Sequence, residues 1–138
     1  MTAAKEWWAW SDKVKDPPRD EAAAKWQARK KRETRRLARL LLPQIRKAAQ
    51  AMGYAIGLHG SVARDIDLIA VPWRDDCYEP QELAEVICWI CKAETGWGFF
   101  SSGDNNPTVK PHGRLAWSIH MWGTYIDLSV TPRAGSSC

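Results

Sequence analysis

The stretch GLHGSVARDIDLIAVPW (residues 57–73) places two carboxylates in a segment that otherwise has the composition of a buried strand. Strand side chains alternate between two faces, so Asp65 and Asp67 project to one face while Ile66 and Leu68 project to the other. Two residues of strand rise put the two aspartate Cα atoms roughly 6–7 Å apart. Two anions this close repel each other, and a divalent cation between them removes the repulsion.

A third aspartate recurs in the same setting near the end of the chain. Asp127 lies between Ile126 and Leu128 in the strand-like segment YIDLSV. If this strand lies next to the first, Asp127 joins Asp65 and Asp67 on one sheet face. Three carboxylates can hold two metal ions, an arrangement suited to phosphoryl or nucleotidyl transfer. The alternative is that the aspartates are ordinary edge-strand charges that face water.

A Gly-Ser dipeptide comes shortly before the first two aspartates. Gly60 lets the backbone approach a ligand closely, and exposed N–H groups together with the Ser61 hydroxyl can hold a phosphate. Most Gly-Ser pairs are plain turns. A Gly-Ser turn followed at once by an Asp-x-Asp strand is a more specific signal of a phosphate site beside a metal site.

These motifs resemble the polymerase-beta-like nucleotidyltransferase superfamily, especially its minimal, single-domain members. The motif of that family begins with a hydrophobic residue, a glycine, and then a second glycine or a serine. A spacer follows, and after it a strand with the pattern Asp-hydrophobic-Asp-hydrophobic. A third acid lies on a later strand. The resemblance covers roughly residues 45–131. The matching segments are Gly60-Ser61, Asp65-Ile66-Asp67-Leu68, Asp127 and the Ser61-Val62-Ala63-Arg64 segment that resembles Ser-x-Ala-Arg of minimal members.

The resemblance implies a metal-dependent nucleotidyltransferase that moves a nucleoside monophosphate from a nucleoside triphosphate to a hydroxyl acceptor. The acceptor would be a protein, an RNA or a small molecule. Asp65, Asp67 and Asp127 would be the catalytic residues and would bind Mg2+ or Mn2+. Triphosphate binding would fall to Gly60, Ser61, Arg64, Lys110 and Arg114.

Two features depart from the family pattern. His59 fills the hydrophobic position just before the glycine, and the spacer over residues 62–64 is shorter than is usual in the family. A short spacer shortens the phosphate-binding turn. The alternative function is therefore a catalytically inactive relative that binds nucleotide or nucleic acid as an interaction module.

The pattern of elements predicts an α+β (mixed α/β) fold with helices flanking a small mixed β-sheet, nucleotidyltransferase-like, with a basic helical extension at the N-terminus. Segment 1–19 is Trp-rich, and we expect Asp16-Pro17-Pro18 to end a short helix there. A single domain over 20–138 should then begin with a long helix, 21–52, capped by Asp20 and kinked or divided at Pro43. The remaining expected elements form the sheet core 54–131: strands at 54–59, 65–71, 97–101, 114–121 and 124–131, a helix at 80–94, and a loop at 102–113.

The charge is distributed unevenly along the chain. Residues 1–53 contain 14 Lys and Arg against 6 Asp and Glu, whereas residues 54–138 contain 6 and 10. The basic helix over 25–39 is a candidate surface for nucleic acid, whose binding would depend steeply on salt. The alternatives are a solvated face and a face that packs against the acidic body.

The sequence also predicts where the protein resides. No apolar run approaches the ~20 residues of a membrane span, and the N-terminal sequence lacks the apolar core and cleavage site of a signal peptide. Four cysteines are too few for a disulfide framework in a chain of 138 residues. We therefore expect a cytoplasmic protein with no membrane partner.

Overall fold

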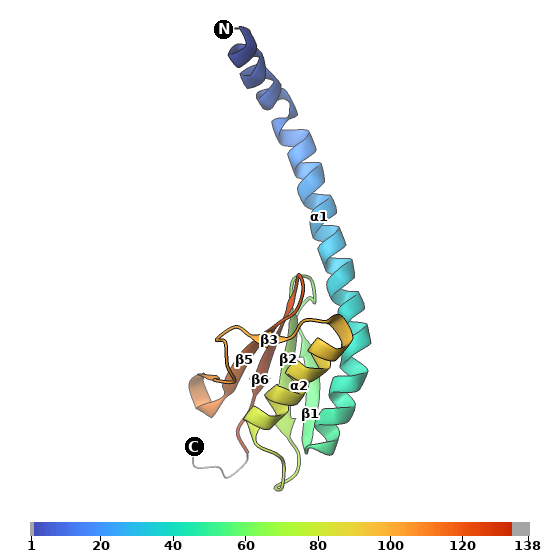
Figure 1. Ribbon diagram of the computed structural model, residues 1–138, viewed down its shortest axis with the longest axis vertical. Coiled ribbons are helices and arrows are strands. Elements are labelled where there is room, and N and C mark those ends of the chain that lie inside the picture. The colour runs from blue at the N-terminus through green and yellow to red at the C-terminus, as the bar shows by residue number, and fades with distance from the viewer. Residues whose placement is uncertain (1, 134–138) are drawn as a thin grey trace.

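In a computed structural model of the chain, helices pack against one face of a mixed β-sheet (Figure 1). The structure describes the backbone of residues 2–133 and the side chains of residues 20–133. Within these bounds the expected α+β class is confirmed, with two α-helices and six strands. The elements are α1 (Thr2–Ala51), β1 (Tyr54–His59), β2 (Ile66–Pro72), α2 (Pro80–Thr95), β3 (Phe99–Phe100), β4 (Thr108–Val109), η1 (Pro111–Gly113), β5 (Leu115–His120) and β6 (Tyr125–Val130).

The strands follow the order β1-β2-β6-β5-β3, and β4 pairs with β5 as well. The β2–β6 pair is parallel, whereas each other pair of described strands is antiparallel. The expected hairpin at the C-terminal end is confirmed as β5 and β6, which are joined by a tight turn with Gly123 at φ +83°. Because β2 and β6 are parallel, the segments that enter them meet at the same edge of the sheet.

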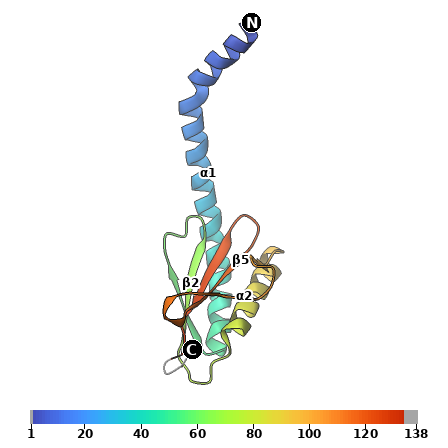
Figure 2. The same cartoon turned by 90° about the vertical axis from the view of Figure 1, so that its left-hand side faces the viewer.

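Among the described residues, the helices cover one face of the sheet. Alternate residues of β2 and β6 are at most 1% exposed and pack in one core with the helices, whereas the residues between them are only half-buried. Figures 1 and 2 show α1 and α2 together on the covered side. Burying these branched side chains is the main stabilising contribution of the sheet. The core residues on β2 and β6 are Ile66, Leu68, Ala70, Ile126, Leu128 and Val130.

Helix α1 differs from the sequence-based expectation. The predicted break at Asp16-Pro17-Pro18 and the predicted start at residue 21 are wrong, because α1 begins at Thr2 and runs to Ala51. The helix also stays undivided at Pro43. A proline removes one backbone donor and crowds the preceding turn, but its fixed φ is itself helical, so the flanking turns can continue the helix. The tryptophan side chains of segment 1–19 and the chain end at 134–138 lie outside the described residues.

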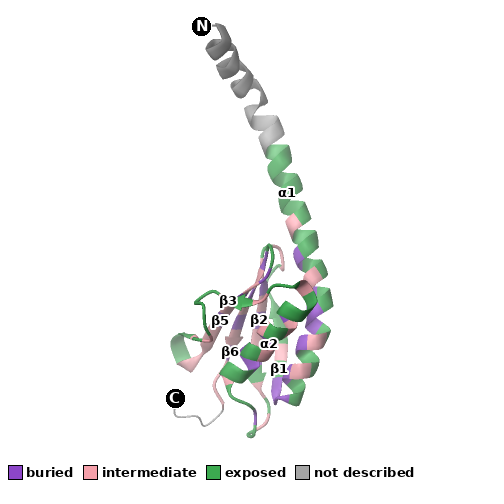
Figure 3. Ribbon diagram, in the orientation of Figure 1, coloured by how far each residue is buried: buried purple, intermediate pink, exposed green. Residues whose placement is uncertain are grey.

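The two halves of α1 have different surroundings. Residues 20–33 are almost all exposed and extend beyond the sheet, whereas the helix packs against the sheet from Thr34 onward (Figure 3). The basic stretch 25–39 therefore begins on the projecting part and ends against the body. Over the residues described, neither α1 nor α2 has an apolar stretch sufficient to span a lipid bilayer.

Helix α2 begins and ends where the local sequence predicts, whereas the segment after it differs in part. Pro80 occupies the first turn of α2, and the Gly96 N–H caps the other end by donating to the Lys92 carbonyl over 2.9 Å at φ +82°. The expected loop at 102–113 is only partly a loop, because it contains β4 and the short helix η1. Two-residue strands are too short to show an alternating pattern, so periodicity could not reveal them.

The core assignment predicts a large difference between two leucines. Leu68→Ala removes a fully buried side chain of β2 and should lower the free energy of unfolding by about 2–5 kcal/mol in urea titrations. Leu40→Ala is the matched control, because Leu40 is 44% exposed on α1. That variant should stay within about 0.5 kcal/mol of the parent. Equal losses in the two variants would contradict the assignment of the covered face.

Candidate metal centre

Strand pairing brings the three aspartates together. The parallel register of β2 and β6 sets Asp67 opposite Asp127, and Asp65 lies at the residue just before β2. One carboxylate oxygen from each side chain lies within 4.8 Å of the other two. Among the described residues, this is the one cluster of three acidic, histidine or cysteine side chains with such spacing.

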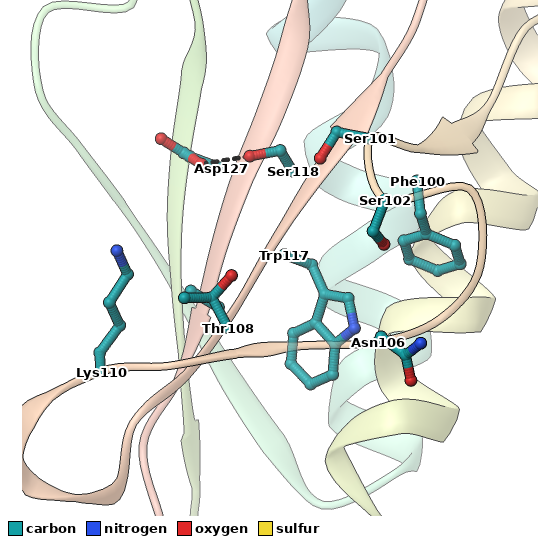
Figure 4. A pocket seen from close by; sticks show the side chains of 10 residues that line it. Phe100, Ser101, Ser102, Asn106, Thr108, Lys110, Trp117, Ser118 and Asp127 are labelled. Carbon is teal, nitrogen blue, oxygen red and sulfur yellow. Dashed lines mark hydrogen bonds between the residues drawn. The ribbon is translucent and has the colours of Figure 1, made fainter.

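A row of polar residues crosses four strands on the open face of the sheet. In the strand registers, His59 lies opposite Asp67, Asp67 opposite Asp127, and Asp127 opposite Ser118. The Ser118 hydroxyl donates a hydrogen bond of 3.1 Å to Asp127 Oδ1 (Figure 4). This bond fixes the orientation of Asp127 and leaves its second oxygen available for another partner.

The electrostatics of the cluster favour a cation. Burial raises the pKa of the Asp67 carboxyl, and the neighbouring charges of Asp65 and Asp127 raise it further, while His59 acts in the opposite direction. The Tyr125 phenol interacts with the Asp65 carboxylate, and its pKa is raised by that interaction. Burial of Asp67 and the hydrogen bond between Tyr125 and Asp65 are the largest causes, and the mutual repulsion of the carboxylates adds to both shifts. A bound divalent ion would offset that repulsion.

The ligand set fits Mg2+ or Mn2+. Both ions prefer carboxylate oxygens, and Mg2+ binds its ligands at about 2.0–2.1 Å. Two oxygens on one such ion are therefore at most about 4.2 Å apart. The observed spread of up to 4.8 Å is close to that limit, so small side-chain rotations would bring Asp65, Asp67 and Asp127 onto an ion.

The Gly-Ser turn lies directly against the trio. Gly60 has φ +82°, and a Cβ added there would lie 2.8 Å from Asp67 Oδ2. Ser61 is exposed, and its carbonyl accepts a hydrogen bond of 3.3 Å from Arg35 of α1. In the short spacer Val62 also adopts a positive φ, +52°, which is unusual for a β-branched residue. The short spacer thus holds the turn tightly against the acids.

The structure separates the three basic residues that the sequence suggested. Lys110 and Arg114 line an open hollow together with Asp67 and Asp127. Arg114 donates a hydrogen bond of 3.1 Å to the Ser129 hydroxyl, and the Lys110 side chain extends toward Asp127 (Figure 4).

Arg64 lies elsewhere. It lines a different hollow with Lys30 and Lys31 of α1, on the side of the projecting helix. Its carbonyl accepts a hydrogen bond of 2.8 Å from the Thr124 hydroxyl. Arg64 is therefore grouped with the basic helix and not with the hollow that contains Asp67 and Asp127.

Sequence reasoning missed Ser118 and Arg35, and it placed His59 beside the Gly-Ser turn without relating it to the aspartates. His59 lines the same hollow as Asp67, Ser118 binds Asp127, and Arg35 reaches the Gly-Ser turn. His59 and Ser118 could be found only once the strand registers were known. Arg35 belongs to a run of similar basic residues, and only the packing of α1 distinguishes it from its neighbours.

Comparisons with known proteins return no match, whether with family models, curated proteins or solved structures. The chemistry of the carboxylate trio is therefore inferred from its own geometry and charge.

Gly60→Ala tests the contact between the turn and the trio. The substitution should lower the free energy of unfolding by about 1–2 kcal/mol, because alanine is strained at the positive φ of Gly60. It should also weaken Mn2+ binding about 10-fold or more in calorimetric titrations, because its Cβ displaces the Asp67 carboxylate. Gly96→Ala is the control, since Gly96 has the same φ of +82° and a Cβ there meets no described atom within 4 Å. Equal Mn2+ affinities in the two variants would show that the turn does not position Asp67.

Asp67→Asn tests the electrostatic account. A raised folded-state pKa means that ionisation of Asp67 is disfavoured in the fold, so its charge is destabilising at neutral pH. Without metal, Asp67→Asn should therefore raise the midpoint of thermal unfolding at pH 7. With saturating Mn2+, the parent protein should gain stability and the variant should not. A metal-free variant less stable than the parent, or one equally stabilised by Mn2+, would contradict this account.

Proposed function

We propose that the protein is a divalent-metal-dependent nucleotidyltransferase with a nucleotidyltransferase-like fold. It transfers a nucleoside monophosphate from a nucleoside triphosphate to a hydroxyl acceptor. The observation that carries the proposal is the trio Asp65, Asp67 and Asp127, which the parallel pairing of β2 and β6 brings together, with Gly60 beside Asp67. The open sheet face leaves room for substrate beside these residues.

The reaction exchanges one phosphorus–oxygen bond for another. The acceptor oxygen forms a bond to the α-phosphorus, the bond from that phosphorus to the bridging oxygen breaks, and pyrophosphate leaves with the electron pair. Asp65 and Asp67 would hold the metal, and Asp127 would contribute a ligand to the same site. A bound metal would supply charge stabilisation for the transferring group, and Asp127 would help to deprotonate the acceptor hydroxyl.

The phosphates have candidate partners on two sides of the trio. The Gly60-Ser61 turn, with Gly60 beside Asp67, would supply backbone N–H groups and the Ser61 hydroxyl. Lys110 and Arg114 would supply positive charge in the hollow that contains Asp67 and Asp127. Their placement matches the negative charge of a triphosphate and of the pyrophosphate that leaves.

A second candidate function is nucleotide binding without turnover. The observation that favours it is the short spacer with Val62 at φ +52°, which restricts how far the turn can open around a triphosphate. In this reading the trio still binds a metal–nucleotide complex, and the protein acts as an interaction module.

Pyrophosphate release separates the two functions. With each nucleoside triphosphate, Mn2+ and an RNA oligonucleotide as acceptor, the parent protein should release pyrophosphate and label the acceptor. Asp67→Asn and Asp127→Asn should each lose at least about 100-fold in rate, because each removes a metal ligand. Asp104→Asn, in the exposed loop after β3, is the control and should keep the full rate.

Binding measured alongside decides the remaining outcomes. Mn2+-dependent nucleotide binding with no pyrophosphate release, from any triphosphate and acceptor, would favour the second function. A protein that binds no nucleotide in the presence of Mn2+ would contradict both.

A further inference from the structure

A second surface adjoins the carboxylate trio where α1 passes the turn between β5 and β6. A groove runs along this junction, and we refer to it as the α1 groove. The Lys30 ammonium donates a hydrogen bond to the Gly123 carbonyl, so the helix and the turn are fixed to each other. The lining residues include Trp26, Arg29, Lys30, Leu37, Trp122 and Thr124.

Large indole rings are exposed along the α1 groove. Trp26 is 60% exposed and Trp122 is 75% exposed, so neither contributes much to the core. Trp97 packs against Trp122 with ring centroids 5.5 Å apart, and the Lys30 ammonium lies 5.6 Å from the Trp26 ring centroid. These contacts hold the rings in place while leaving aromatic surface accessible to a ligand.

The charge around the rings is strongly positive. Residues 25–39 contain eight Lys and Arg and one acid, Glu33, which pairs with Arg36 over 3.0 Å. A second hollow shares Trp26 and Lys30 with the α1 groove and extends it to Arg64. A polyanion is the ligand that this charge favours.

One hydrogen bond links the α1 groove to the segment that carries Asp65. The Thr124 hydroxyl binds the carbonyl of Arg64, the residue that directly precedes Asp65. A chain bound along the groove would therefore pass near the segment that precedes Asp65. Tryptophan rings interleaved with basic residues are the combination that binds unpaired bases and backbone phosphates together.

We propose that the α1 groove binds single-stranded nucleic acid. Bases stack on Trp26 and Trp122, and phosphates contact Arg29, Lys31 and Arg64. A terminal hydroxyl of this strand is the acceptor, and this last step rests on the proposed function. Duplex ends and acidic proteins are weaker ligands, because paired bases are not free to stack on indole rings and carboxylates offer no π-face.

Fluorescence anisotropy with labelled single strands of about 20 nucleotides, oligo-U and oligo-dT, tests the binding step. Trp26→Ala should weaken binding by roughly 5-fold to 100-fold, because a base loses its stacking partner. The double variant Arg29→Ala/Lys31→Ala should reduce the slope of log affinity against log salt by about 1.4. The control Arg46→Ala/Lys47→Ala removes two exposed charges from the packed end of the same helix and should change neither quantity.

Further measurements distinguish single strands from other polyanions, and strand binding from the proposed nucleotidyl transfer. Inorganic polyphosphate and polyglutamate should bind Trp26→Ala as well as they bind the parent protein, because neither has bases. Asp67→Asn should bind the single strand with parental affinity even where transfer is lost, so failure of the proposed function leaves this result intact. The proposal is overturned if single strands do not bind at low salt, if duplex binds more tightly, or if Trp26→Ala binds single strands like the parent. The proposal would also be overturned if polyglutamate bound with the same affinity as the single strand and lost the same affinity in Trp26→Ala. That result would indicate an acidic protein as the ligand of the α1 groove.

Discussion

The parallel pairing of β2 and β6 is the constraint on which the site depends. Two strands far apart in the sequence are held in a register that sets Asp67 opposite Asp127. The two aspartates gain no stability from being neighbours, because their charges repel. The register is set instead by the hydrophobic residues that alternate with the aspartates along β2 and β6. Their branched side chains are buried against the helices, on the face of the sheet opposite the aspartates. A slip by one residue would bring the acids into the core, so the hydrophobic pattern that stabilises the sheet also fixes where the candidate metal ligands lie.

Covering only one face of the sheet has a functional consequence. The helices exclude water from one side, and the acids, His59 and Ser118 share the other. On that side the turn at Gly60 and the hollow containing Lys110 border the same carboxylates. The projecting half of α1, drawn in Figure 2, carries basic and aromatic residues that line the α1 groove. Substrate phosphates, metal and acceptor strand therefore have separate candidate positions around one cluster.

Much of this arrangement could be predicted from local patterns. The alternation around Asp67 and Asp127 identifies two strands and the face that each acid shares, because the strand period is independent of context. Gly96 marks the end of α2 for the same reason, since its left-handed φ is a local requirement. The continuity of α1 through Pro17 could not be predicted, because proline signals weaken a helix without determining whether its neighbours sustain it.

The missed residues share one cause. The role of Arg35 and the exposure of Trp26 depend on where α1 lies relative to the sheet. The position of α1 is set by packing between segments that are remote in sequence. The strand registers that place His59 and Ser118 are likewise tertiary. A sequence predicts which groups have the right chemistry, whereas long-range packing selects those that meet.

The most direct test of the central claim is an anomalous diffraction experiment on crystals grown with Mn2+ and a non-hydrolysable nucleoside triphosphate. We expect anomalous peaks at the Mn2+ absorption edge within coordination distance of Asp65, Asp67 and Asp127, with the triphosphate extending along the Gly60-Ser61 turn. A map with Mn2+ bound elsewhere, or with residue 127 turned away from the other two aspartates, would contradict the account.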